Sequence, residues 1–204
     1  RRAIELLAMI PTIIAAGHRL AAGSEPIAPK QEYSQAANLL YMLRGSEPED
    51  HEVAAMDTSL ILYAEHGFNA STFTARVVAS TLSELCASIV AGIGALAGPL
   101  HGGANEQAMA MLEQIDSESA AEDWVLKALA DKRKIMGFGH REYRTGDSRV
   151  PIMKEVGRNL AACQQDSRWV DIAEVVERTM DREKGIFPNV DFPCAYVYYM
   201  LGIP

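Results

Sequence analysis

Apolar side chains recur at three- and four-residue steps along almost the whole sequence. No segment shows the strict two-residue alternation of a half-buried strand. Near the start, Ile4, Leu7, Ile10, Ile14 and Leu20 follow mixed steps of this kind. Because a helix turns once in about 3.6 residues, such steps put apolar side chains on one face. The sequence therefore predicts an all-α, multi-helical fold.

The predicted helices cover most of the sequence. Two of them begin with the capping-box spacing, in which Ser precedes Glu by three residues: Ser46 with Glu49, and Ser119 with Glu122. Glycines cluster at 98–103, which indicates a possible domain change there. The expected helices span 2–21, with a kink at Pro11, then 32–44, 46–63, 71–79, 82–97, 103–114, 119–133, 151–165, 168–182 and 193–201.

Charge excludes some classes of partner. Lys and Arg number 19 and Asp and Glu 27, so the formal net charge is −8. An acidic chain is a poor candidate for non-specific binding of nucleic acid or anionic membranes. A local basic cluster still allows a small anionic ligand.

The cysteines and the first residues of the sequence indicate the cellular compartment of the protein. Cys86, Cys163 and Cys194 lie far apart without a CxxC motif, which is typical of reduced thiols in a cytoplasmic protein. We expect no membrane span and no signal peptide, because Glu5 interrupts the first apolar run. The chain starts with Arg1 rather than Met and stops at LGIP, so we expect a fragment or a processed piece.

Known short motifs give little support for nucleotide binding, a metal site or serine-hydrolase chemistry. Residues 92–97 match the dinucleotide-binding pattern GxGxx(G/A), but the segment before them is helical rather than a strand. Small residues for helix packing explain this match better. No P-loop, HExxH, GxSxG or zinc-ligand spacing occurs, so no metal site is expected.

Three of the five histidines lie next to glycine where a helix breaks. These are His66, His101 and His140, whereas His18 and His51 lie among surface-type helical residues. Glycine permits close approach of backbone or ligand, and sites are often built on such breaks. Each of the three is a candidate site residue, with a structural role as the alternative.

His101 lies just before an expected helix. The positive end of a helix dipole disfavours an imidazolium ion, so a histidine there would stay neutral. A neutral imidazole can donate a hydrogen bond to a carbonyl oxygen that becomes an enolate. The alternative is a histidine that only caps the helix.

Residues 132–149 are unusually basic for an acidic chain, and Asp191 is a lone acid in an apolar turn bounded by prolines. Arginines in such a cluster can bind phosphate or carboxylate groups, and a partly buried carboxylate makes a better base. A solvated charged face and a turn-forming Asp are the alternatives. The basic residues are Lys132, Arg133, Lys134, Arg141, Arg144 and Arg149.

Four long stretches together resemble the citrate synthase family. They are LILYAEHGFNASTFTARVVAST (60–81), GPLHGGANEQAMAML (98–112), KIMGFGHREYRTGDSRV (134–150) and NVDFPCAYVYYMLGIP (189–204). The first of these is more similar to the 2-methylcitrate synthase branch than to the mainstream citrate synthases.

The resemblance implies a two-domain, cytoplasmic homodimer that condenses propionyl-CoA or acetyl-CoA with oxaloacetate and then hydrolyses the thioester. Residues 1–100 would form part of the large domain. Residues 101–204 would form the small domain with the start of the return to the large one. The CoA thioester would be a substrate, with no cofactor, nucleic acid or membrane involved.

The resemblance also assigns roles. His101 matches the neutral histidine that stabilises the thioester enol, Asp191 the base that removes the α-proton, and His140 the group that polarises the oxaloacetate ketone. His66, His140 and Arg149 match positions that bind oxaloacetate. Arg144 matches a residue on the CoA phosphates, and the adenine site matches the backbone of Met136, Gly137, Phe138 and Gly139.

Family members are considerably longer than this chain, and some of their oxaloacetate-binding arginines lie beyond its end. The alternative function is therefore a catalytically inactive helical module that only binds or dimerises.

Overall fold

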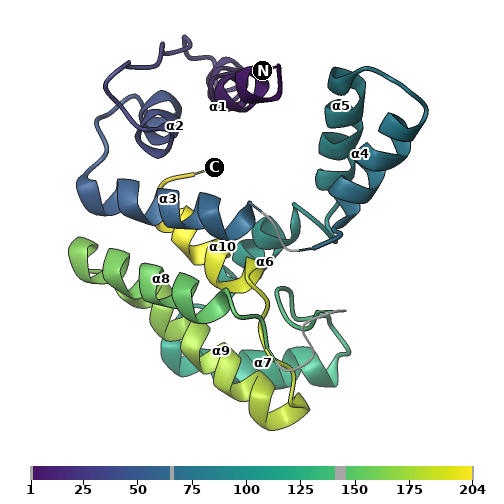
Figure 1. Ribbon diagram of the computed structural model, residues 1–204. Coiled ribbons are helices and arrows are strands. Elements are labelled where there is room, and N and C mark those ends of the chain that lie inside the picture. Colours follow the sequence, from purple (N-terminus) through teal and green to yellow (C-terminus); the bar gives the residue numbers. More distant parts are fainter. Residues whose placement is uncertain (1, 65–66, 141–145, 204) are drawn as a thin grey trace. The chain divides into compact units, whose positions relative to one another are not determined.

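The computed structural model describes residues 2–64, 67–140 and 146–203. Over these residues the chain is a set of helices joined by loops, with one isolated bridge between Phe138 and Pro188 and no strand (Figure 1). The predicted all-α class is confirmed. The helices are α1 (Arg2–Ala21), α2 (Gln35–Arg44), α3 (Asp50–Tyr63), α4 (Ala70–Ser80), α5 (Leu85–Leu96), α6 (Ala104–Leu112), α7 (Glu118–Ala130), α8 (Val150–Gln164), α9 (Arg168–Lys184) and α10 (Asp191–Met200).

The chain forms two compact units. One contains residues 1–64 and 198–204, and the other contains residues 65–197. The predicted boundary at residue 100 does not coincide with this division, because α4 and α5 belong to the second unit. The assignment of 1–100 and 101–204 to the two domains of the family fold stays a prediction.

The first unit is built on α2, which packs against both α1 and α3. Its small core includes Ala15 of α1 with Met42 and Leu43 of α2. The α2 helix starts where the Ser34 side chain accepts a hydrogen bond from a helix amide, and it ends at Gly45 in the left-handed region (φ 80°).

The predicted capping box of the third helix is wrong by three residues. Glu49, rather than Ser46, caps α3, and its partner in the box is Glu52. Pro48 explains the shift, because the residue before a proline is kept out of the helical region. The helix therefore starts only after the proline.

The second predicted capping box is also wrong. α7 starts one residue earlier than expected, after Ser117, and Ser119 lies inside the helix. Its hydroxyl contacts that of Ser117 (3.0 Å) instead of capping an amide. Side-chain spacing alone does not choose between two serines this close together.

An ion pair joins the end of α2 to the start of α3. The guanidinium of Arg44 donates two hydrogen bonds to the Glu52 carboxylate (2.6 and 2.8 Å) and one to the carbonyl of Leu201 (3.3 Å). Glu52 also accepts the Glu49 amide. The hydrogen bonds from Arg44 are the largest cause that lowers the pKa of the Glu52 carboxyl. One charged pair therefore connects α2, α3 and the last residues of the chain.

Replacing Glu52 by Gln should lower the free energy of unfolding by about 1–3 kcal/mol at neutral pH. A lowered pKa in the folded state stabilises the protein above the usual pKa of 4.5, and this contribution is lost as pH falls through the lowered value. Urea unfolding at pH 7 and about pH 3.5 should show the difference from the native protein shrinking at the lower pH.

Glu47→Gln is the matched control, since it removes an exposed ion pair with Lys30. It should move the urea midpoint much less than Glu52→Gln. Equal effects of the two variants would show that the Arg44 pair adds nothing beyond an ordinary surface contact.

One described helix, α1, is long and apolar enough by length and composition to cross a membrane, although Glu5 interrupts its apolar run. A core helix or a signal sequence near the N-terminus passes the same test. Pro11 lies inside this helix, and Ala15 is buried against α2. Much of its apolar surface is exposed, as at Ile4 and Leu7.

The second unit is organised around α9, against which α6, α7 and α8 pack (Figure 1). The start of α10 is almost fully buried, and α8 contributes Gly157 where the Tyr196 ring lies. A Cβ at Gly157 would lie 2.5 Å from that ring, so only glycine allows this contact. Burial raises the pKa of the Tyr196 hydroxyl. The buried face of α9 consists of Trp169, Val170, Ile172, Ala173, Val175, Val176, Thr179 and Met180.

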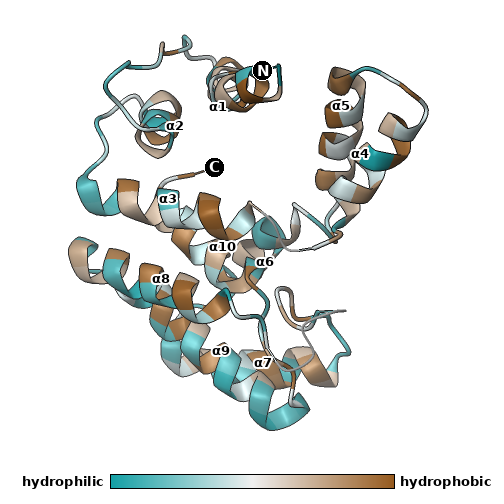
Figure 2. Cartoon of the chain, viewed as in Figure 1, coloured by the Kyte–Doolittle hydropathy of each residue, from teal (hydrophilic) through white to brown (hydrophobic). Residues whose placement is uncertain are grey.

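In the same unit α4 and α5 pair with each other. Figure 2 shows hydrophobic residues along α5, and several apolar side chains of this pair remain exposed, including Phe73 and Val90. Exposed apolar area of this kind is typical of surfaces that bind another protein surface.

Candidate functional site

The loop between α5 and α6 carries His101. Gly102 approaches the end of α5 so closely that a Cβ would lie 2.5 Å from the carbonyl oxygen of Leu96. Gly103 then caps α6, which begins at Ala104. The glycines after His101 therefore allow the chain to turn tightly and place the half-buried histidine two residues before the helix cap.

Ser71, at the start of α4, holds the His101 ring. Its hydroxyl lies 2.8 Å from Nε2 of His101 and 2.9 Å from the carbonyl oxygen of Gly92. Its amide N–H donates to the same Nε2 (3.3 Å). These contacts of Ser71 fix the position of the His101 ring next to the start of α4. The neutral role of His101 stays a prediction.

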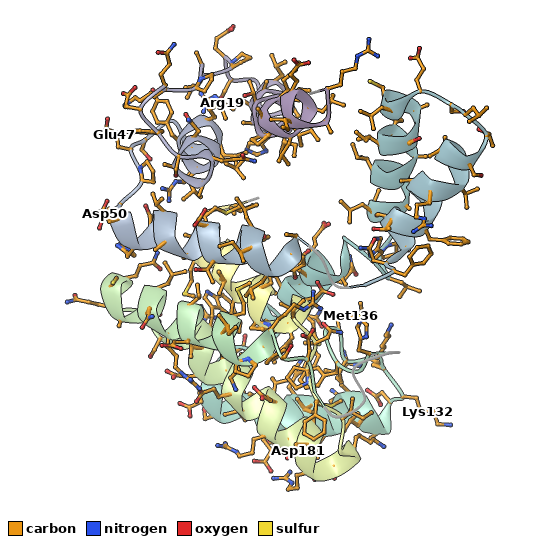
Figure 3. All side chains as sticks on the ribbon, viewed as in Figure 1. Arg19, Glu47, Asp50, Lys132, Met136 and Asp181 are labelled. Carbon is orange, nitrogen blue, oxygen red and sulfur yellow. The ribbon has the colours of Figure 1, made fainter. Side chains whose placement is uncertain are left out.

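Residues 136–140 lie against the start of α10. The carbonyl of Gly137 accepts the Asn189 amide (2.9 Å), and the rings of Phe138 and Phe192 are 4.7 Å apart. Gly137 has φ 79°, and a Cβ there would lie 2.7 Å from the Cβ of Phe192. The structure thus requires glycine at this position of the GFGH motif. Met136 is labelled in Figure 3 on the connection between α7 and α8.

Gly137→Ala should lower the free energy of unfolding by about 2–4 kcal/mol, because left-handed strain and overpacking against Phe192 add together. Urea unfolding measures this change. Gly94→Ala is the control, since Gly94 lies in α5 with open space at its Cβ position. We expect that control to stay within about 1 kcal/mol of the native protein. Equal stability of the two variants would contradict the close contact at Gly137.

Asp191 is the first residue of α10 and is half-buried. Its amide donates to Oδ1 of Asn189 (3.0 Å), and the Asn189 side-chain amide donates to the carbonyl of Gly139 (2.9 Å). Gly139 directly precedes His140. One asparagine side chain therefore joins the backbone beside two of the predicted catalytic residues.

Arg149 is held by Asp147. The guanidinium donates to both carboxylate oxygens (2.9 and 2.7 Å), and the Asp147 side chain is only 1% exposed. Asp147 also accepts the amides of Arg149 and Val190 (3.0 and 3.1 Å). Burial alone would raise the pKa of the Asp147 carboxyl, but these hydrogen bonds outweigh it and the pKa is lowered. A buried, charged pair thus connects Arg149 to the residue before Asp191.

The structure brings three of the predicted site segments to one place. Asn189 donates to the carbonyl of Gly139 next to His140, and Val190, next to Asp191, donates to the Asp147 carboxylate that holds Arg149. The helix after His101 also reaches α10, where the Asn105 side chain donates to the Cys194 sulfur (3.9 Å).

The other predicted site residues fall into two groups. His66, Arg141 and Arg144 lie outside the described residues. Lys132 and Lys134 are exposed, in agreement with the alternative of a solvated face. Within the described ranges, no group of three or more His, Cys, Asp or Glu side chains could hold a metal ion.

Sequence reasoning missed Ser71, Asp147 and Asn189. Asp147 and Asn189 each lie two residues before a predicted site residue, a spacing at which Asp and Asn side chains often bind the backbone amide. This spacing could therefore have identified Asp147 and Asn189 from the sequence. Ser71 is 30 residues from His101, and no local pattern links the two.

Comparisons with known proteins agree with the site motifs. The family model for the citrate synthase C-terminal domain matches residues 1–204. The 2-methylcitrate synthase of Mycobacterium tuberculosis H37Rv is 47% identical over 98% of the chain and 51% of that protein. Citrate synthase 2 of Bacillus subtilis is also 47% identical, over 100% of the chain and 55% of that protein.

Solved structures agree as well. The ternary complex of Thermoplasma acidophilum citrate synthase with carboxymethyl coenzyme A and oxaloacetate has a TM-score of 0.88 and 34% identity, over 97% of this chain and 54% of that one. Citrate synthase from Pyrobaculum aerophilum has a TM-score of 0.87 and 41% identity, over 95% of this chain and 49% of that one.

The helical architecture and the site motifs are those of the citrate synthase fold. The chain belongs to the citrate synthase family. It spans about half the length of the relatives it matches.

Proposed function

We propose that the full native protein condenses an acyl-CoA with oxaloacetate and releases free CoA. With propionyl-CoA the product is 2-methylcitrate, and with acetyl-CoA it is citrate. The CoA thioester is a substrate, and the proposed reaction uses no metal or further cofactor.

One observation carries this proposal. The start of α10, with Asp191 as its first residue, is hydrogen-bonded on one side to the segment that ends in His140. On the other side it is bonded to the carboxylate that holds Arg149. A base, a polarising histidine and a carboxylate-binding arginine on connected backbone are the groups that this condensation needs.

In the proposed mechanism Asp191 removes a proton from the carbon next to the thioester. The neutral His101 donates a hydrogen bond to the thioester oxygen and so stabilises the enol that forms. His140 polarises the ketone of oxaloacetate, while His66 and Arg149 bind its carboxylates. The enol carbon attacks the ketone, and water then hydrolyses the thioester to release CoA.

The surroundings of Asp191 suit this role. It is half-buried at the start of α10, where Asn189 joins it to the segment that ends in His140. Ser71 holds Nε2 of the His101 ring, so in the proposed mechanism the other ring nitrogen donates to the thioester oxygen. Arg144 and residues 136–139 would bind the CoA phosphates and adenine, as the family motif implies.

Asp191→Asn should lower kcat for CoA release by about 10²–10⁴-fold, because the amide cannot accept the α-proton. Free thiol release by the full native protein with oxaloacetate measures this effect. Asp123→Asn, at an exposed position of α7, is the control and should keep native activity. An active Asp191→Asn protein would overturn the assignment of the base.

The acyl chain is the second question for the same assay. The sequence of residues 60–81 resembles the 2-methylcitrate synthase branch, so we expect faster CoA release with propionyl-CoA than with acetyl-CoA. One methylene in an apolar pocket changes the rate ratio by about 10–200-fold. Faster release with acetyl-CoA would instead assign a citrate synthase, and no release with either would contradict the proposed function.

A homodimer in the cytoplasm is part of the proposal. The exposed apolar side chains of α4 and α5, such as Phe73 and Val90, support a partner surface in this unit. The sparse cysteines, without a CxxC motif, suit a reducing compartment.

A further inference from the structure

Asn189 forms hydrogen bonds to backbone groups of the candidate site through both its main chain and its side chain. Its main-chain amide donates to the Gly137 carbonyl (2.9 Å), and its side-chain amide donates to the Gly139 carbonyl (2.9 Å). Its Oδ1 accepts the amide of Asp191, and its carbonyl accepts that of Phe192 (3.1 Å). Both ends of the side chain are therefore used, one on each of two segments.

The two segments that Asn189 joins carry different reactants in the proposed mechanism. Gly139 directly precedes His140, which acts on oxaloacetate, and Asp191 acts on the acyl-CoA. Gly137 and Gly139 in the first of these segments both have positive φ (79° and 78°), a backbone conformation that glycine adopts without strain. A fixed link across them would hold the base and the polarising histidine in one geometry.

We propose that Asn189 is a positioning residue that sets the placement of Asp191 relative to His140 through its side-chain bridge between Gly139 and Asp191. This inference rests on the proposed function. A displacement of about 1 Å between reacting groups can cost on the order of 10²-fold in rate. Asn189 touches neither reactant in this account and acts only through the two backbone segments.

Two substitutions separate the two ends of the bridge. Asn189→Ser keeps a short oxygen that can accept the Asp191 amide but is too short to reach Gly139. Asn189→Ala removes both bonds. We expect kcat for CoA release to fall about 10- to 100-fold in both variants, with the larger fall in the alanine variant. The KM for oxaloacetate should change little.

Asn38 supplies a matched control in the other compact unit. Its side-chain amide donates to the carbonyls of Lys30 and Tyr33 (2.9 and 3.1 Å), and its Oδ1 accepts the Lys30 amide (2.8 Å). Asn38→Ser and Asn38→Ala therefore remove the same kinds of bond from a different loop. They should lower the melting temperature to a similar degree without a matching loss of kcat.

The deciding readout is the deuterium isotope effect on kcat with acyl-CoA deuterated at the α-carbon. Misplacement of the base slows proton removal, so the isotope effect should rise in the Asn189 variants. A loss of folded protein alone would leave it at the native value. Native kcat in Asn189→Ala, or a lower kcat with an unchanged isotope effect, would overturn the inference.

The native protein and Asp191→Asn are assayed in parallel. If the native protein releases no CoA, both the proposed function and this inference are wrong. If it releases CoA and the Asn189 variants keep their rate and isotope effect, only the role of Asn189 is wrong.

Discussion

The hydrogen bonds at the start of α10 are the constraint on which the arrangement of the site depends. The Asn189 side chain binds the Gly139 carbonyl and the Asp191 amide, while the Asp147 carboxylate binds the Val190 amide and the Arg149 guanidinium. The Asn189 main-chain amide also donates to the Gly137 carbonyl, and the Gly139 amide donates to the Phe187 carbonyl. Because two polar side chains serve several backbone groups each, a short segment organises residues that are distant in sequence.

Packing makes this arrangement rigid. The residues that follow Asp191 are buried, and Phe192 contacts both the Phe138 ring and the backbone at Gly137. Farther along α10, Tyr196 fills the space left by Gly157 of α8. Such close contacts leave little room for the helix to shift, so the first turn of α10, which carries Asp191, is held in place.

Much of the fold could be predicted from the sequence, because helical periodicity persists over every long segment. The first residue of each helix was harder to predict. At α3, Pro48 shifts the N-cap from Ser46 to Glu49. Neighbouring serines at 117 and 119 posed the same difficulty for α7. Local spacing identifies a cap only when one choice is compatible with the backbone that precedes it.

The motifs predict the site residues, and the two-residue spacing could have indicated Asp147 and Asn189, whereas Ser71 could not be found from the sequence. Glycines mark His101 and His140, and the reason for Gly102 and Gly137 is visible only as the close approach to Leu96 and Phe192. Ser71 reaches His101 across 30 residues, which no periodicity reveals. Contacts that depend on tertiary packing cannot be read from spacing, whereas tight turns can.

The central claim is that Asp191 is the base and that it lies where the acyl-CoA and oxaloacetate meet. A crystal structure of the full native protein with oxaloacetate and carboxymethyl coenzyme A tests it most directly. We predict an Asp191 carboxylate oxygen about 3–3.5 Å from the analogue's atoms that replace the reacting acetyl group, with His140 at the oxaloacetate ketone. Analogue and oxaloacetate bound elsewhere, or Asp191 turned away from them, would contradict it.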